Sequence, residues 1–134
     1  MTKVKQFTVQ TGSTVQFIRI DHKVNEIIQE SGVQNGIAVI FVPHTTAGVT
    51  INENADPDVV RDMIMETNKM VPFNDGYLHG EGNSAAHIKS SLVGPSLSVI
   101  IENGRVLFGT WQSIYFCEFD GPRSRRAVVK IIEG

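Results

Sequence analysis

Residues 77–87, with the sequence YLHGEGNSAAH, hold side chains that can bind both a metal ion and an anion. His79 lies just before a glycine turn, and His87 lies about one turn into the helix that should follow it. A loop and the helix that it leads into can direct both imidazoles at one point. A third imidazole, His44, follows an apolar run. Three neutral imidazoles that converge would bind a divalent metal and leave coordination positions open.

Two glutamates are candidates for a general base, or for the group that orients a metal-bound imidazole. Glu81 lies inside the glycine turn, and Glu53 lies at the end of an expected strand. Either carboxylate can accept a proton or hydrogen-bond the second ring nitrogen of a histidine. Each also has a structural explanation that fits the sequence equally well. Glu81 suits the positive end of a helix, and Glu53 suits an exposed strand end.

The glycine turn offers backbone N–H groups to an anion through Gly80, Gly82, Asn83 and Ser84. Glycine lets the backbone approach a ligand closely, and a helix start has free N–H groups. The turn lacks the Lys-Ser/Thr pair of a nucleotide P-loop, so it does not indicate ATP binding. Judged by the local pattern alone, an ordinary capped helix start explains these residues better than an anion site does.

A second candidate for anion binding is the arginine-rich segment 120–126, DGPRSRR, in a chain whose net charge is −2. Arg123 and Arg125 should share one face of a strand, with Arg126 on the other face. Guanidinium groups bind phosphate through paired hydrogen bonds, so we predict that Arg123 and Arg125 bind an anion. Arg126 is expected in an ion pair or at a solvated sheet edge. Gln112 is polar among apolar neighbours and is expected to face the pocket.

Composition indicates one globular domain over residues 1–134, because the chain is 41% hydrophobic and 19% charged. No run of like charges indicates nucleic acid or an anionic membrane as a partner. No apolar segment approaches the roughly 18 residues of a membrane span. The single cysteine, Cys117, excludes an internal disulfide and is expected to be inert. The N-terminal residues do not resemble a signal peptide, so we expect a cytoplasmic protein.

The hydrophobic periodicity predicts an α+β fold, a mostly antiparallel β-sheet or sandwich of about eight strands with three helices. The helices are expected after caps at Asp21, Asp56 and Asn83 or Ser84. The strands are expected over residues 3–10, 15–20, 36–42, 47–53, 96–102, 105–110, 113–119 and 126–132.

Three features of this fold are specific enough to be checked. The strands over 3–10 and 15–20 should form a hairpin, since a short turn joins them. The continuous apolar strand over 36–42 should be buried on both faces. Asn103-Gly104 is the strongest hairpin-turn signal in the chain.

Several blocks of the sequence together resemble the YjbQ-like family of small proteins. They are HTTA at 44–47, NEN at 52–54, HGEGNSAAH at 79–87, GTWQ at 109–112 and DGPRSR at 120–125. The resemblance covers nearly the whole chain. It implies an α+β fold of mostly antiparallel strands that assembles as a homotrimer.

The resemblance also implies that His44, His79 and His87 are the metal positions, with zinc as the ion. Members are often described as secondary thiamine-phosphate synthases, which join a pyrimidine diphosphate to a thiazole phosphate and release diphosphate. Both substrates carry phosphate, which Arg123, Arg125 and the glycine turn can hold.

The sequence leaves three functions open. The first is a metal-binding enzyme that acts on small phosphorylated metabolites, with thiamine-phosphate synthase-type transfer as its specific form. The second is a metal-dependent hydrolase in which Glu81 or Glu53 is the base. The third is a non-catalytic trimer that binds a metal or a metabolite.

Overall fold

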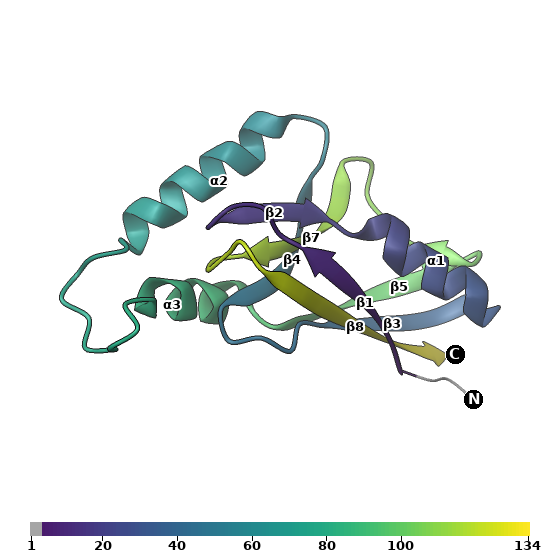
Figure 1. Cartoon of the computed structure of the whole chain (residues 1–134). Helices are drawn as coiled ribbons and strands as arrows, with labels where there is room; N and C mark the ends of the chain where they lie inside the picture. Colours follow the sequence, from purple (N-terminus) through teal and green to yellow (C-terminus); the bar gives the residue numbers. More distant parts are fainter. Residues whose placement is uncertain (1–3) are drawn as a thin grey trace.

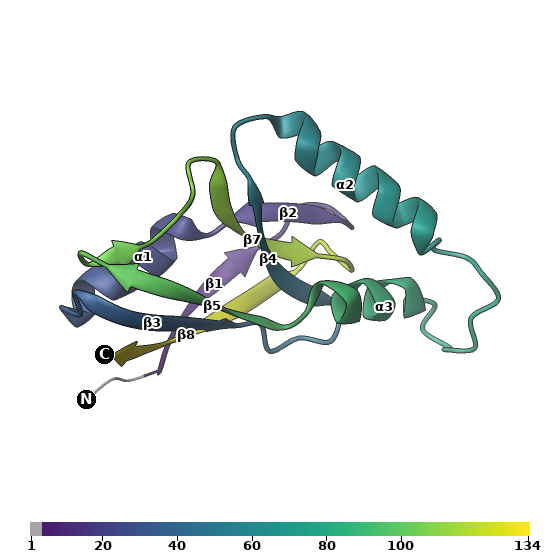
Figure 2. The same cartoon turned by 180° about the vertical axis from the view of Figure 1, so that it is seen from behind.

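The computed structural model describes residues 4–134, which form eight strands and three helices, as the sequence predicts (Figures 1 and 2). The first strand is β1 (Val4–Gln10), and Lys3, its expected first residue, lies outside the described residues. The other elements, in chain order, are β2 (Gln16–Arg19), α1 (Asp21–Ser31), β3 (Asn35–Phe41), β4 (Ala47–Glu53), α2 (Pro57–Met70), α3 (Ser84–Val93), β5 (Ser96–Glu102), β6 (Arg105–Val106), β7 (Gln112–Glu118) and β8 (Ser124–Glu133).

The strands form two sheets, and every strand pair is antiparallel. One sheet has the order β1-β8-β3-β5-β6 and the other has the order β2-β7-β4. The predicted hairpin of the first two strands is wrong, because β1 pairs with β8 and β2 pairs with β7. The short segment between them carries the chain from one sheet to the other. Alternating residues predict that a strand forms, but they do not determine which strand it pairs with.

The middle strand of the larger sheet, β3, is buried on one face only, so the prediction of two buried faces is wrong. Ala38 and Ile40 are fully buried, whereas Ile37 and Phe41 are 45% and 44% exposed. Val24 and Ile28 of α1 belong to the same buried cluster as Ala38 and Ile40, so α1 covers that face. A run of apolar residues alone does not show whether a strand is buried on one face or on both.

The helix starts differ in how they use their acidic residues. The prediction that Asp21 caps α1 is wrong, because Ile20 is the N-cap residue. The Asp21 carboxylate instead accepts hydrogen bonds from the Ile114 N–H, at 2.6 Å, and from the Ser113 hydroxyl, at 2.8 Å. This contact ties α1 to β7. The predicted cap of α2 is confirmed, since Asp56 accepts a hydrogen bond from the Asp58 N–H at 2.9 Å.

Helix α2 extends away from the two sheets, and the long segment 71–83 leads from it to α3 (Figures 1 and 2). None of the residues of α2 is buried, although Val60 packs against a small cluster around Tyr115 and Phe119. This helix therefore contributes little to the core. None of the helices in the described range is long and apolar enough to cross a membrane.

Helix α3 lies directly against β4. The Ser90 hydroxyl donates to the Ala47 carbonyl oxygen at 2.8 Å. A Cβ atom added to Gly48 would lie 2.7 Å from the Gly94 carbonyl oxygen, so only glycine fits between the strand and the end of the helix. This close packing fixes the position of α3 relative to the segment that precedes β4.

The hairpin turn predicted at Asn103-Gly104 is confirmed. Asn103 has a φ of 54° and Gly104 a φ of 78°, which are the positive angles that a type I′ turn requires. The return strand is shorter than predicted, because β6 spans only Arg105–Val106. After it, residues 107–111 leave the sheet and lead to β7.

Candidate functional site

A pocket of about 920 Å³ lies where the segment after β3, the segment before α3 and the start of β8 meet. Its walls include most of the predicted site residues. The lining residues are Phe41, Val42, Pro43, His44, Thr45, Thr46, His79, Glu81, Asn83, His87, Pro95, Asp120, Arg123 and Arg125. All three histidines of the sequence prediction therefore face one pocket.

His79 and His87 are neighbours in this pocket. Their ring centroids lie 5.5 Å apart, and the two rings are nearly perpendicular, at 88°. The Glu81 carboxylate oxygen Oε1 lies 3.9 Å from Nε2 of His79. His79 comes from the loop and His87 from α3, so the glycine turn brings them together as the spacing predicted. Two imidazoles and a carboxylate are donors that Zn²⁺ accepts.

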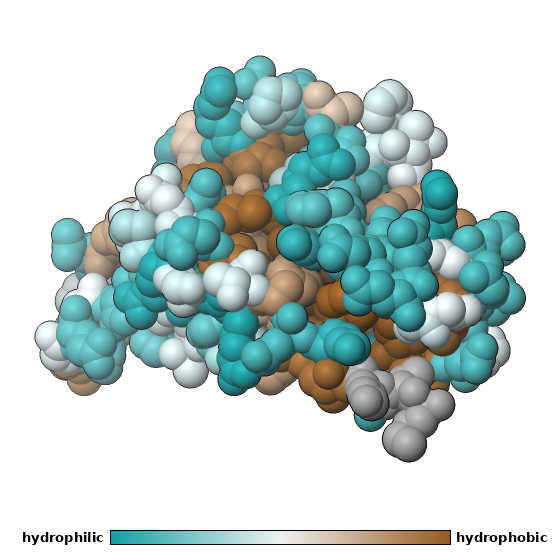
Figure 3. All heavy atoms as spheres, turned by 45° about the vertical axis from the view of Figure 1, so that its right-hand side comes forward, coloured by the Kyte–Doolittle hydropathy of each residue, from teal (hydrophilic) through white to brown (hydrophobic). Residues whose placement is uncertain are grey.

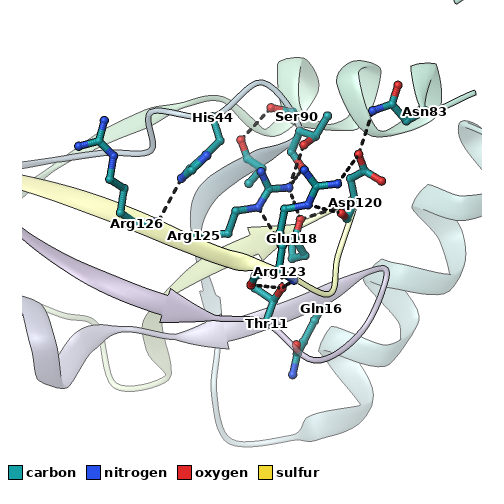
Figure 4. A network of polar contacts seen from close by, with 12 residues as sticks. Thr11, Gln16, His44, Asn83, Ser90, Glu118, Asp120, Arg123, Arg125 and Arg126 are labelled. Atoms are coloured by element: carbon teal, nitrogen blue, oxygen red, sulfur yellow. Dashed lines mark hydrogen bonds and ion pairs between the residues drawn. The ribbon is translucent and has the colours of Figure 1, made fainter. Parts of the chain in front are cut away.

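His44 lies in the same pocket, but one of its ring nitrogens is already in use. Nε2 of His44 accepts a hydrogen bond from the Arg126 N–H at 3.0 Å (Figure 4). Burial lowers the pKa of His44, and the positive charge of Arg125 lowers it further. The imidazole is therefore neutral, with its hydrogen on Nδ1. As a metal ligand, His44 would have to release either this hydrogen bond or that hydrogen.

In residues 4–134, no three His, Cys, Asp or Glu side chains gather closely enough to hold a metal ion. The structure brings His79 and His87 together and leaves His44 bound to the backbone of β8. The donor types suit Zn²⁺, and two of the three imidazoles are suitably near each other. Metal binding by the three histidines stays a prediction.

Arg125 is buried at the floor of the pocket in an ion pair with Glu118 (Figure 4). Its Nε donates to Oε1 of Glu118 at 2.8 Å, and its Nη2 donates to Oε2 of the same carboxylate. Nη2 also donates to the Thr46 hydroxyl at 2.8 Å. Glu118 accepts further hydrogen bonds from the Thr11 hydroxyl and the Asp120 N–H.

Arg123 lies at the rim and is half-exposed. It precedes β8, whereas Arg125 lies within β8 on its buried face, so the two do not share a strand face as predicted. Nη2 of Arg123 lies 3.2 Å from Oδ2 of Asp120. The same oxygen accepts a hydrogen bond from the Asn83 amide at 2.8 Å. Asp120 therefore joins the segment before α3 to the start of β8.

The glycine turn itself lies mostly outside the pocket lining. Of its four predicted anion-binding residues, Asn83 lines the pocket, and Gly80, Gly82 and Ser84 do not. The Gly82 N–H is used by a hydrogen bond to the His79 carbonyl oxygen at 3.1 Å. Asn83 is the N-cap residue of α3, but its side chain does not cap the helix. Its Oδ1 atom is buried without a hydrogen-bond partner among the described residues, which makes it a free acceptor beside the pocket.

Glu53 and Gln112 lie in a different part of the molecule. They face each other across β4 and β7 and line a separate groove with Trp111. Glu53 ends the strand that Ala47 begins, so roughly 20 Å of β4 separates it from the histidine pocket. The sequence placed Glu53 at a strand end and Gln112 between two strands, whereas Gln112 begins β7. It could not show which end of either strand lies near the histidines.

The sequence interpretation missed Glu118, Asp120 and Thr46. A usable signal existed for Glu118, because it interrupts the apolar run of β7, and a buried carboxylate in such a run nearly always has a cationic partner. Thr46 and Asp120 carry no comparable signal, since both residue types are common next to strand ends. Cys117 of the same strand is fully buried, and burial raises its pKa far above the usual thiol range.

The fold and the pocket describe a small α+β protein with a site rich in imidazole and guanidinium groups. Residues 5–134 match the model of the family described as UPF0047 protein YjbQ-like, and the chain belongs to this family. The UPF0047 protein YugU of Bacillus subtilis is 50% identical over 130 residues, which cover 96% of this chain and 98% of that protein. A UPF0047 protein of Methanocaldococcus jannaschii is 53% identical over 127 residues, which cover 95% and 92%.

Solved structures agree with this assignment. A crystal structure of a YjbQ/UPF0047 family protein from Clostridium acetobutylicum has a TM-score of 0.94 and 55% sequence identity, and the match covers 96% of this chain and 99% of that one. A YbjQ-like protein of unknown function from Sulfolobus solfataricus has the same TM-score of 0.94 at 28% identity, covering 100% and 99%. The fold is thus kept while most residues differ.

Proposed function

We propose that the pocket binds a divalent metal, Zn²⁺ by its donor types, together with a small phosphorylated metabolite, and that the protein is an enzyme acting on that metabolite. The observation that supports this proposal is that His79, His87, Arg123 and Arg125 line one pocket of about 920 Å³. Imidazole is a preferred ligand of Zn²⁺, and guanidinium is a preferred partner of phosphate. A pocket of this size accommodates a small metabolite.

The proposed role of each residue follows from the chemistry of its side chain. His79 and His87 would hold the metal, and Arg123 and Arg125 would orient the phosphate oxygens. A bound metal would supply positive charge to the oxygens of a leaving diphosphate. The unpartnered Asn83 oxygen can accept a hydrogen bond from a ligand hydroxyl or amine. This division supports thiamine-phosphate synthase-type transfer as the specific reaction.

Elemental analysis of the purified protein tests the metal site. We expect about one equivalent of zinc per chain, and we expect His79→Ala/His87→Ala to lose it. His22→Ala is the matched control, because His22 is exposed on α1 and does not line the pocket. Equal metal content in the wild type and the double variant would contradict the proposal.

A synthesis assay tests the reaction. The metal-loaded protein is incubated with the pyrimidine diphosphate and the thiazole phosphate, and thiamine phosphate and diphosphate are quantified. We expect equal amounts of both products, and we expect Arg123→Met to reduce their formation by at least tenfold. Absence of both products, with metal present, would exclude thiamine-phosphate synthase-type transfer as the reaction.

Hydrolysis is a second candidate, and the position of Glu81 favours it. Its carboxylate lies 3.9 Å from the His79 ring, where it can act as a general base. Phosphatase and esterase activities measured before and after chelation test this candidate. An activity that chelation and Glu81→Gln both abolish would support hydrolysis over transfer. Tight metabolite binding without turnover in either assay would indicate a binding protein instead.

We also propose that the protein is a homotrimer, as the family resemblance implies. The exposed face of the larger sheet supports its assembly. Ile37 pairs with Ile132 on one side and with Ile100 on the other, and all three side chains are exposed. Phe41 lies on the same face of β3. Hydrophobic side chains also reach the surface between hydrophilic ones on the face shown in Figure 3. An apolar row of this kind is typical of a surface that is covered in an assembly.

Light scattering after size exclusion tests the trimer. We expect a mass about three times the 14.8 kDa of one chain. Ile37→Asp should reduce that mass, whereas Met65→Asp, at a similarly exposed position on α2, should not. A monomeric wild type would contradict this part of the proposal.

A further inference from the structure

The hydrogen bonds of Arg125 leave one defined part of its guanidinium free. A guanidinium has five N–H groups, one on Nε and two on each Nη. Nε donates to Glu118, and Nη2 donates both to Glu118 and to the Thr46 hydroxyl. Three of the five groups are thus used within the described residues. The two on Nη1 make no hydrogen bond there, and the side chain lines the pocket.

Glu118 is held as firmly as the arginine that it binds. It is fully buried, and each of its oxygens accepts two hydrogen bonds. Oε1 accepts from Nε of Arg125 and from the Thr11 hydroxyl, and Oε2 accepts from Nη2 of Arg125 and from the Asp120 N–H. Burial favours the protonated acid, but these hydrogen bonds outweigh burial and keep the pKa of Glu118 below its usual range.

The second arginine of the pocket also has a carboxylate beside it. Arg123 lies 3.2 Å from Asp120, and its Nε donates to the Asp120 carbonyl oxygen at 2.8 Å. Each arginine charge in the pocket is therefore matched by one carboxylate charge. An anion that enters the pocket meets oriented N–H groups rather than an excess of positive charge.

We propose that Glu118 is a positioning residue, which turns the guanidinium of Arg125 so that its Nη1 N–H groups point into the pocket and bind an oxygen of a phosphate group. This inference rests on the proposed function, since it explains how that site recognises its anion. It adds that recognition works through the direction of hydrogen bonds and only weakly through net charge. Thr46 assists by fixing Nη2, and Thr11 supports Glu118 from behind.

The salt dependence of anion binding by the wild-type protein provides the first test. Inorganic phosphate is titrated into the full chain by calorimetry, as purified and again after chelation, in 50 mM and 500 mM NaCl. Screening weakens charge attraction strongly over this range but affects short, oriented hydrogen bonds little. We expect the Kd to change by less than about twofold. A change of tenfold or more would overturn the inference.

Variants provide the second test. Glu118→Gln keeps the shape of the side chain but replaces an acceptor with a donor that repels the guanidinium. We expect phosphate to bind at least tenfold more weakly and with a steeper salt dependence. A merely structural role of Glu118 would not change the salt dependence. Glu102→Gln is the matched control, because Glu102 is exposed on β5 and does not line the pocket.

Thr46→Val keeps the test decisive if Glu118→Gln does not fold. It removes the hydroxyl that fixes Nη2 and leaves the ion pair in place. We expect roughly threefold weaker phosphate binding with unchanged circular dichroism. Wild-type affinity in Thr46→Val would overturn the inference, whether or not Glu118→Gln folds. Loss of binding in Arg125→Met alone would leave the proposed function intact. No phosphate binding by the wild type in either metal state would contradict the proposed anion site itself.

Discussion

Two cationic side chains are buried among residues 4–134, and they are accommodated in opposite ways. Arg125 is 5% exposed and has a carboxylate partner with four accepted hydrogen bonds around it. Lys89 of α3 is 2% exposed and has no carboxylate partner in the described chain. Its Nζ donates to Oδ1 of Asn68 at 2.5 Å and lies 4.4 Å from the centre of the Phe73 ring.

The two side chains stabilise different regions of the protein. The ion pair of Arg125 joins β7 and β8 to the segment before β4, so three parts of the chain fix one side chain next to the pocket. Lys89 joins α3 to α2 and to the loop after it, through one amide and one ring. Because α2 has no buried residues, it is only lightly attached to the rest of the protein. We expect the pocket floor to be rigid and α2 to open more readily.

The largest effect should come from removing the carboxylate alone. Glu118→Leu leaves the guanidinium of Arg125 buried without its partner, and we expect a loss of about 3–5 kcal/mol in the free energy of unfolding. Urea denaturation of the wild type and the variant measures this loss. Glu118→Leu/Arg125→Met removes both charges and should recover most of the loss. A double variant as unstable as the single one would show that the hydrogen bonds, rather than the charge pair, stabilise this region.

Acid should weaken the same region by a smaller amount. The folded-state pKa of Glu118 lies below the ordinary value of 4.5, so the folded protein binds fewer protons than the unfolded chain as pH falls past that value. This contribution is complete above the ordinary pKa and is lost as pH falls through the folded-state pKa. Denaturation between pH 6 and pH 3 should therefore show a decline that Glu118→Leu/Arg125→Met reduces. Parallel curves for the two proteins would argue against a perturbed Glu118.

For Lys89 we expect the opposite response, a gain on removing the charge. Burial lowers the pKa of Lys89, so the folded state disfavours its charged form. Lys89→Met keeps a similar volume, and we expect stability at pH 7 to rise by about 1 kcal/mol. Raising the pH from the folded-state pKa toward 10.5 should stabilise the wild type relative to this variant. A marked loss at pH 7 would mean that the contacts to Asn68 and Phe73 outweigh the cost of burial.

The smallest effect should come from the cap of α2. Asp56→Ala removes the hydrogen bond to the Asp58 N–H, and we expect a local loss of about 0.5 kcal/mol. Hydrogen exchange should show faster exchange in the amides of α2, while the amides of β3 and β8 in the same sample stay unchanged. Equal acceleration in both regions would mean that α2 opens only with the whole protein.

Local sequence signals predicted the elements of the fold well but not their partners. The Asp56-Pro57 helix start and the Asn103-Gly104 turn are confirmed because each depends on neighbouring residues only. The pairing of β1 with β8 joins residues more than 110 positions apart, which no local pattern encodes. The same reason explains why Asp21, a good cap by type, is drawn instead to the backbone of β7.

The site was predictable to the extent that it is local. His79 and His87 lie on one loop and its helix, and the structure brings their rings to 5.5 Å. Glu53 looked equally suitable, yet the direction of β4 carries it to the other end of the strand. Glu118 was missed because its importance depends on its ion pair with Arg125, which lies on the next strand of the chain but in the other sheet.

The absence of a side chain at Gly48 means that a substitution outside the pocket can alter the pocket. A single methyl group there would press on the carbonyl that ends α3, and the helix would have to slide along β4 to relieve the clash. His87 belongs to that helix, so its imidazole would shift relative to His44 and Arg125 although no pocket residue had been changed. The geometry of the pocket thus depends on a residue that has no side chain and does not line the pocket.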